Sequence, residues 1–167
     1  MNVYCVFCKS GTEDSVSEQI ATLMPQIEVL IPVRTIQEKK QGNWTERKQQ
    51  LIPGYIFLYI EDEVTFQNIK MLSNVFNVLK YSDNTRELKG ADYQYAMWLY
   101  RYFGNISTST IITEGSNIKV IDGPLKDGIG KIIKLDRHKR RAWVEIEFLG
   151  TKRIVSLSIE DITSRTA

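Results

Sequence analysis

The densest positive charge in the sequence is a short segment near its C-terminal end. Four permanent cations occupy the five positions after Asp136, namely Arg137, Lys139, Arg140 and Arg141. Because one neighbouring carboxylate cannot pair with all of them, the excess charge is expected to attract phosphates and release counterions. The planar guanidinium of arginine also suits phosphates and guanine edges. The segment therefore predicts a nucleic-acid contact, against the alternative of a solvated turn.

A tryptophan and further cations extend this candidate site. Trp143 lies two residues beyond Arg141 on a predicted strand and is expected to point outward, where it either stacks on an unpaired base or packs over the protein surface. Lys152 and Arg153 follow on the returning strand, about 20 Å from the turn at roughly 3.3 Å per residue. A ligand that touches both ends must be extended, as an RNA stem is. The candidate RNA-binding residues are Lys131, Lys134, Arg137, His138, Lys139, Arg140, Arg141, Trp143, Lys152 and Arg153.

The two cysteines, Cys5 and Cys8, have the CxxC spacing that also occurs in redox and zinc sites. On a predicted strand this spacing puts the two sulfurs on opposite faces. A zinc site needs four ligands, and the sequence has one histidine, His138. We therefore expect no metal site, no cofactor and no redox function. A single histidine and the lack of a GxxxxGK loop also predict a protein that is not an enzyme.

The composition is that of an ordinary globular protein. The chain has 167 residues, of which 43% are apolar and 25% are charged. It lacks an apolar run of the roughly 18 residues needed for a membrane span, and its start does not resemble a signal peptide. With two cysteines, a reducing cytoplasm is the expected location. The charge is uneven: residues 1–113 hold 11 cations and 12 anions, whereas residues 114–167 hold 11 and 8.

Up to residue 103 the pattern predicts strands interleaved with helices. Residues 38–50 are polar and contain Gly42-Asn43, which predicts a hairpin excursion. Apolar residues at helical spacing predict helices after Thr12, after Asp62 and at 91–103. The expected strands are 3–8, 29–36, 55–60 and 75–81. This order predicts an α+β domain in which helices flank an antiparallel sheet.

The remaining sequence has a different character. Residues 104–113 are uncharged and rich in Ser and Thr, which predicts a flexible linker. From residue 114 onward apolar and polar side chains alternate, most clearly at 142–148, and glycines recur between the alternating segments. Short strands with frequent glycines over about 50 residues predict a small all-β barrel.

Three stretches resemble a known family. Residues 4–13 (YCVFCKSGTE) and 51–58 (LIPGYIFL) resemble the N-terminal, or NGN, domain of NusG-type transcription elongation factors. Residues 114–130 (EGSNIKVIDGPLKDGIG) resemble the KOW motif that follows it in that family. The resemblance implies a non-enzymatic factor whose NGN domain spans 1–103, followed by a flexible linker at 104–113 and an SH3-like KOW domain at 114–167.

The resemblance also implies partners. NGN domains of this family bind the clamp helices of RNA polymerase, whereas the alternative for each matching residue is a place in the core. The predicted hairpin at 38–50 either reaches polymerase or non-template DNA or is a mobile solvated loop. We expect a monomer with no membrane partner. The residues that match the family's polymerase site are Phe7, Ile52, Tyr55, Phe57, Val78 and Tyr81.

The basic turn at 136–141 indicates which subgroup of the family the chain resembles. It is similar to that of the specialised LoaP-type paralogues, whose family role is antitermination of long biosynthetic operons through an RNA hairpin in the leader transcript. Housekeeping members instead contact Rho and a ribosomal protein through the KOW barrel. The resemblance therefore implies an antitermination factor that binds polymerase and a structured RNA, with the housekeeping elongation factor as the alternative.

Overall fold

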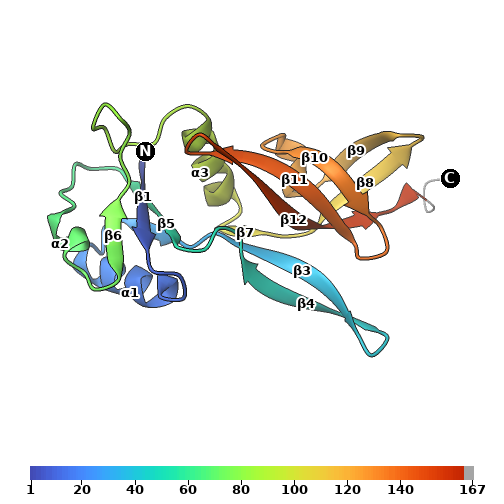
Figure 1. Ribbon diagram of the computed structural model, residues 1–167, viewed down its shortest axis with the longest axis horizontal. Helices are drawn as coiled ribbons and strands as arrows, with labels where there is room; N and C mark the ends of the chain where they lie inside the picture. Colours follow the sequence, from blue (N-terminus) through green and yellow to red (C-terminus); the bar gives the residue numbers. More distant parts are fainter. Residues whose placement is uncertain (164–167) are drawn as a thin grey trace. The chain divides into compact units, whose positions relative to one another are not determined.

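The computed structural model describes residues 1–163 of the chain. Its contacts divide the chain into two compact units, whose helices and strands are labelled in Figure 1. Unit 1 comprises residues 1–32 and 52–104, and unit 2 comprises residues 33–51 together with the chain from residue 105 onward. Both units are therefore assembled from segments that are distant in the sequence.

Unit 1 contains a four-stranded sheet with the strand order β2-β5-β1-β6. Its strands are β1 (Asn2–Cys8), β2 (Glu28–Leu30), β5 (Tyr55–Ile60) and β6 (Val75–Val78). All neighbouring strands run antiparallel. The two central strands, β1 and β5, are predominantly apolar because both faces of the sheet are covered over most of their length. The predicted α+β fold is thus confirmed.

One face of this sheet is covered by α1 (Glu13–Leu23) and α2 (Gln67–Lys70). The helix side chains Val16, Ile20 and Ile69 are fully buried against it, as their helical spacing predicted. From the strands the same core receives Val6, Cys8, Ile56, Leu58, Ile60 and Val78.

The third helix, α3 (Ala91–Arg101), packs on the opposite face of the sheet. The ring centroids of Tyr95 and Phe57 lie 6.0 Å apart, and the Tyr59 hydroxyl donates a hydrogen bond of 2.6 Å to the carbonyl of Ala96. Burial raises the pKa of Tyr59 far above its ordinary value, so this hydroxyl keeps its proton and remains a donor. The aromatic density of the helix therefore serves mainly to cover this face.

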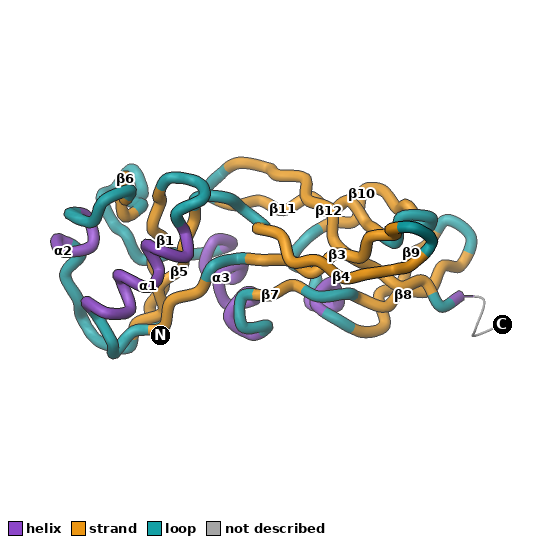
Figure 2. Tube along the Cα trace, turned by 90° about the horizontal axis from the view of Figure 1, so that it is seen from below, coloured by secondary structure: helices purple, strands orange, loops and turns teal. Residues whose placement is uncertain are grey.

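Unit 2 consists of a five-stranded sheet, β10-β11-β12-β8-β9, and a three-stranded sheet, β4-β3-β7. A short 3-10 turn at Pro124–Asp127 follows β9. Figure 2 shows how strands dominate this part of the chain, where β3 packs against β12. The strands are β3 (Val33–Lys40), β4 (Asn43–Gln50), β7 (Asn105–Ile106), β8 (Ser109–Glu114), β9 (Asn117–Asp122), β10 (Lys131–Asp136), β11 (Arg141–Phe148) and β12 (Thr151–Asp161).

The core of unit 2 follows the alternation that the sequence shows. Ala142, Val144, Ile146 and Phe148 of β11 are all buried, whereas the residues between them are partly or fully exposed. Strand β11 pairs antiparallel with both β10 and β12, and β12 continues into a parallel pairing with β8. The predicted all-β C-terminal part is therefore confirmed.

The segment predicted to be a linker forms strands β7 and β8. Ile106, Ser109 and Ile111 are fully buried, and β8 is hydrogen-bonded to β9 and β12. The segment lacks charge because several of its side chains are buried. Its β-branched Ile and Thr residues favour strands. The domain boundaries expected from the sequence stay a prediction, although the contacts place residues 33–51 with the C-terminal strands.

Other elements are shorter than the patterns predicted. The strand expected at 29–36 is divided into β2 and β3 at Ile31-Pro32, because proline lacks the N–H that would continue a ladder. The helix expected after Asp62 is the single turn α2, and β6 ends at Val78. The hairpin expected at 38–50 is confirmed: β3 and β4 pair along their whole length and turn at Gln41-Gly42.

Candidate functional site

Three aromatic side chains form a row across neighbouring strands of unit 1. Phe7 of β1 lies opposite Tyr55 of β5 in the strand register, and their ring centroids are 5.3 Å apart. On the other side, the Phe7 ring lies 5.2 Å from that of Phe76 on β6. Phe7 and Tyr55 share a face with Phe57, the face on which α3 packs, because side chains alternate along a strand. We call Tyr55, Phe7 and Phe76 the aromatic row.

The aromatic row is accessible to a partner. Phe76 is 63% exposed, and Phe7 and Tyr55 are half-buried. Phe76 was missed by matching to the family motif, although it stands in a strand that the sequence did predict. The pairing of β1 with β6 shifts register between Phe7 and Cys8, so simple alternation does not reveal which side chain of β6 meets Phe7.

The other four residues expected on the polymerase face are buried or lie outside the aromatic row. Phe57 and Val78 are fully buried, with Val78 in the core beneath α1, and Ile52 is only 5% exposed. Tyr81 follows β6, where its hydroxyl donates a hydrogen bond of 2.7 Å to Asp92. Burial is the largest of the effects that raise the pKa of Tyr81 to about 12. Of the six expected residues, the structure brings together Phe7 and Tyr55 on an accessible surface.

A buried carboxylate fixes the turn that precedes Tyr55 of the aromatic row. The side chain of Glu13 is 1% exposed and accepts hydrogen bonds from the backbone N–H groups of Gly11, at 2.5 Å, and Gly54, at 3.0 Å. Gly54 has a φ of +88°, and a Cβ there would lie 3.0 Å from the carbonyl oxygen of Cys8 and 3.2 Å from the Phe7 ring. The Pro-Gly-Tyr turn therefore requires glycine because it packs directly against Phe7.

We expect Glu13→Gln to lower the free energy of unfolding of the protein by about 1–3 kcal/mol, since a neutral amide offers one acceptor where two N–H donors need one each. Thermal or urea unfolding of the variant measures this loss. Asp14→Asn is the matched control, because Asp14 lies in the same helical turn but is exposed. Equal stability of the two variants would contradict a bracing role for Glu13.

The basic turn between β10 and β11 is partly neutralised within unit 2. Arg137 forms an ion pair of 2.9 Å with Asp161 and donates a hydrogen bond of 2.8 Å to Thr113. Burial alone would raise the pKa of Asp161, but hydrogen bonds from Thr163 and the charge of Arg137 outweigh it and lower that pKa. Asp161 therefore stays anionic, and Arg137 is tied to the barrel.

Arg140 and Arg141 face the β3–β4 hairpin. The guanidinium carbon of Arg140 lies 4.0 Å from the centroid of the Trp44 ring, and its Nη1 donates to Gln37 Oε1 at 2.9 Å. A guanidinium over an aromatic face is a favourable cation–π contact. A terminal nitrogen of Arg141 lies 4.0 Å from a carboxylate oxygen of Glu38. Carboxylates that are distant in the sequence, Asp161 and Glu38, thus take up part of the charge that the adjacent Asp136 cannot neutralise.

Hydrogen bonds hold the hairpin against the barrel. Arg34 of β3 donates to the carbonyl of Ser156 on β12 at 2.5 Å, and its guanidinium also donates to Gln49 within the hairpin at 2.8 Å. Gln37 donates to the hydroxyl of Ser158 at 3.0 Å. Burial lowers the pKa of Arg34. The ordinary pKa of arginine is so high that the side chain still keeps its charge. The hairpin and the barrel thus form one continuous surface.

The remaining candidate RNA-binding residues divide between the two ends of β11. His138 and Lys139 are exposed in the turn, and the Lys134 ammonium lies 5.2 Å from the centroid of the Trp143 ring. At the other end, the Lys152 ammonium lies 3.6 Å from a carboxylate oxygen of Glu145. Lys131 of β10 is the strand partner of Glu145.

The far-end residues carry less surplus charge than the turn. Arg153 pairs in register with Ile146 and is half-buried. Glu145 and Glu147 stand on the strand beside Lys152 and Arg153. The turn end of the barrel is therefore the more electropositive of the two.

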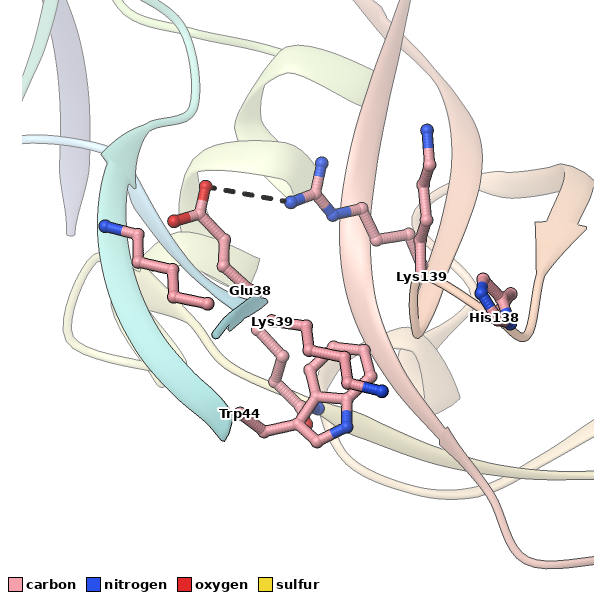
Figure 3. Close-up of a pocket in the computed structure, with 8 residues that line it drawn as sticks. Glu38, Lys39, Trp44, His138 and Lys139 are labelled. Atoms are coloured by element: carbon pink, nitrogen blue, oxygen red, sulfur yellow. Dashed lines mark ion pairs between the residues drawn. The ribbon is translucent and has the colours of Figure 1, made fainter. Parts of the chain in front are cut away.

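A pocket of about 440 Å³ opens where the hairpin meets the basic turn (Figure 3). Its lining includes Trp44, Lys39, Lys40, His138, Lys139 and Arg141. The one carboxylate in the lining is Glu38, which Arg47 already contacts at 2.6 Å. The dashed line in Figure 3 marks the ion pair between Glu38 and Arg141. The pocket therefore combines an aromatic ring with a surplus of positive charge.

Within residues 1–163, no cluster of three or more His, Cys, Asp or Glu side chains has the geometry to hold a metal ion. Cys8 lies in the core beneath α1, and burial raises the pKa of its thiol, which disfavours the reactive thiolate. In the same residues, no helix combines the length and apolar character needed to span a bilayer.

Comparisons with known proteins identify the family of this chain. The family model described as "Transcription termination factor nusG" matches residues 1–94, and the model of the KOW motif matches residues 114–147. The transcription termination/antitermination protein NusG of Rickettsia conorii is 22% identical over 95% of this chain and 88% of its own length. NusG of Pseudomonas aeruginosa is also 22% identical, over 81% of this chain and 78% of its own.

A solved structure supports the same assignment at the level of the fold. The Thermotoga maritima NusG structure titled "Domain interaction in Thermotoga maritima NusG" has a TM-score of 0.60 and 20% sequence identity, and covers 94% of this chain and 93% of that one. Since the first family model alone covers more than half of the sequence, the chain belongs to the NusG family of transcription termination and antitermination factors and carries a KOW motif in its C-terminal part.

Proposed function

We propose that this protein is a specialised antitermination factor of the LoaP type. It binds the clamp helices of RNA polymerase through its NGN part, at 1–103, and a structured leader RNA through its KOW part, at 114–167. The bound factor promotes processive transcription of selected operons in the cytoplasm, acting as a monomer. The relatives' printed names include both termination and antitermination, and the proposal assigns this chain to the second activity.

The aromatic row supports the polymerase contact. Apolar patches on proteins that work alone are usually small, and a Phe that is 63% exposed beside two further aromatic rings is typical of a partner-binding surface. An exposed aromatic surface on a rigid sheet suits the apolar face of a partner helix. Aromatic side chains are also the ones that most often dominate binding energy.

The observation that carries the RNA contact is the positive charge gathered around Trp44. Lys39, Lys40, Lys139 and Arg141 line one pocket with this ring, and the single carboxylate there is already shared with Arg47. Cations attract the phosphate backbone, and aromatic rings stack on unpaired bases. A site for Rho or a ribosomal protein, as in the housekeeping alternative, has no need of this combination.

Attachment to two partners explains how modest affinities suffice. While polymerase holds the factor, a transcript emerging from the same enzyme meets the RNA site at a high effective concentration. Neither contact then needs to be tight alone. Selectivity comes from transcripts whose leader contains the recognised fold.

The proposal is tested by titrating the full-length protein with leader RNA hairpins and with scrambled duplexes of equal length at several salt concentrations. We expect a preference for one hairpin, and a log–log salt slope of about −2 to −4, since two to four phosphates would be neutralised. Equal binding to every duplex, together with binding to Rho or a ribosomal protein, would favour the housekeeping alternative.

A further inference from the structure

We propose that the pocket between the β3–β4 hairpin and the basic turn binds one unpaired nucleotide of the RNA. Its base lies against Trp44, and its phosphates lie near Lys39, Lys40 and Lys139. This inference rests on the proposed function and deepens it, because it assigns the specific contact to both the hairpin and the KOW barrel. The sequence had confined RNA binding to the barrel.

The first support is the way in which Trp44 is held. The Arg140 guanidinium lies 4.0 Å from the ring centroid and is itself fixed by its hydrogen bond to Gln37. Trp44 is half-buried, yet it borders the pocket. A ring that is already oriented loses little freedom when a base stacks on it, which favours binding.

The second support is the arrangement of charge. Lys39 stands opposite Trp44 in the hairpin register, Lys40 follows it, and Lys139 reaches the pocket from the barrel. All three lysines are exposed, and none takes part in an ion pair within residues 1–163. Lys39 thus lies beside Trp44 on the neighbouring strand, and Lys40 and Lys139 border the same pocket, so the three lysines add positive charge near the place where a stacked base and its phosphates would lie.

The third support is size and shape. A volume of about 440 Å³ lies in the usual range for small-ligand pockets. Bases within a regular A-form stem are stacked and cannot enter such a pocket, whereas a base in a loop or bulge can be turned outward. The pocket therefore selects RNA with an extruded base, while the exposed cations around it hold the stem.

The test measures binding of the full-length protein to an RNA stem-loop with one bulged adenosine and to the same stem without the bulge. We expect tighter binding of the bulged RNA. Trp44→Ala should reduce this preference at least fivefold, in line with the loss of one base–aromatic stack. Trp44→Phe retains a ring and should restore most of the preference. Because Trp44 also contacts Arg140, the thermal unfolding of each Trp44 variant is measured beside its RNA binding, and a variant that melts like the wild type shows that the loss concerns the ring and not the fold.

The charges are tested by the double variant Lys39→Gln/Lys40→Gln. It should weaken binding of the bulged RNA by about tenfold at low salt and flatten the log–log salt slope by up to about 2. The matched control, Lys119→Gln/Lys126→Gln, removes the same charge from exposed positions of β9 and the 3-10 turn outside the pocket lining. It should change the slope by less than half as much.

The outcomes separate the inference from the proposed function. If the protein binds hairpin RNA but neither Trp44→Ala nor the lysine variant alters the bulge preference, the pocket assignment is overturned and the RNA function stands. If no RNA binds at low salt, both fail. Equal affinity for the same bulged stem made of DNA would overturn the assignment to RNA.

Discussion

Phe76→Asp is expected to weaken binding of RNA polymerase by about 30-fold or more. A side chain that anchors an interface is typically worth about 2 kcal/mol or more, and a carboxylate buried against an apolar helix adds a desolvation penalty. Phe76 is 63% exposed in this structure, so few contacts within the protein depend on it and the fold should persist. Binding to purified core polymerase, measured beside a thermal unfolding curve, checks the result.

Phe103→Asp is the matched control for this variant. Phe103 is 83% exposed and lies just beyond α3, outside the aromatic row. Its φ of +55° is a backbone conformation that aspartate tolerates. Both changes therefore replace an exposed phenylalanine with a charge, and only the one in the aromatic row should matter. Wild-type affinity in Phe76→Asp would remove the aromatic row from the polymerase contact.

Phe7→Asp should abolish the same binding, but its interpretation depends on stability. Phe7 is half-buried, and its ring lies next to Gly54 and between two other aromatic rings. A charge at this position disturbs the sheet as well as the surface. Phe76 therefore gives the cleaner test, and Phe7→Asp is informative where unfolding shows that the variant is folded.

The sequence predicted the sheet and helices of unit 1 well because local periodicity reports burial. It predicted the polymerase surface less well. A central strand is apolar on both faces, so Phe57 and Tyr55 look alike in the sequence although α3 packs against the first and leaves the second accessible. The place of Phe76 depends on a register shift, which no local pattern records.

The charged site shows a different limit. The run of cations was visible in the sequence, but its partners were not, since Arg140 reaches Gln37 across 103 residues of chain. Glu38 and Trp44 lie in a hairpin whose sequence also suits a solvated loop. The long-range packing of β3 against β12 decides which cations form ion pairs or hydrogen bonds within the protein and which line the pocket.

Gly123→Ala is expected to destabilise unit 2 by about 3 kcal/mol or more, which would lower its melting temperature by about 10 °C or more. Gly123 has a φ of +95° and a ψ of −178°, a region essentially restricted to glycine. An added Cβ would lie 2.6 Å from Cα of Ser109, which is fully buried and whose hydroxyl accepts a hydrogen bond from Leu125 N–H. The backbone of Thr108 and Ser109 therefore leaves the methyl group no space.

Gly128→Ala separates strain from steric clash. Gly128 lies in the same KOW motif with a φ of +72° and a ψ of 20°, but a Cβ there meets no atom within 4 Å. Gly128→Ala should therefore lower the free energy of unfolding by about 1 kcal/mol, the energy that a left-handed backbone conformation costs a residue with a side chain. Unfolding of both variants in urea measures the difference of roughly 2 kcal/mol or more that the close approach to Ser109 predicts.

The same pair of variants tests whether the two proposed contacts are carried by separate units. The aromatic row belongs to unit 1, whereas Gly123 and the RNA pocket belong to unit 2. At a temperature where Gly123→Ala unfolds unit 2, RNA binding should disappear while polymerase binding stays within about twofold of wild type, because additivity holds for independent sites. A parallel loss of both activities would show that the units unfold together and that polymerase binding depends on the barrel.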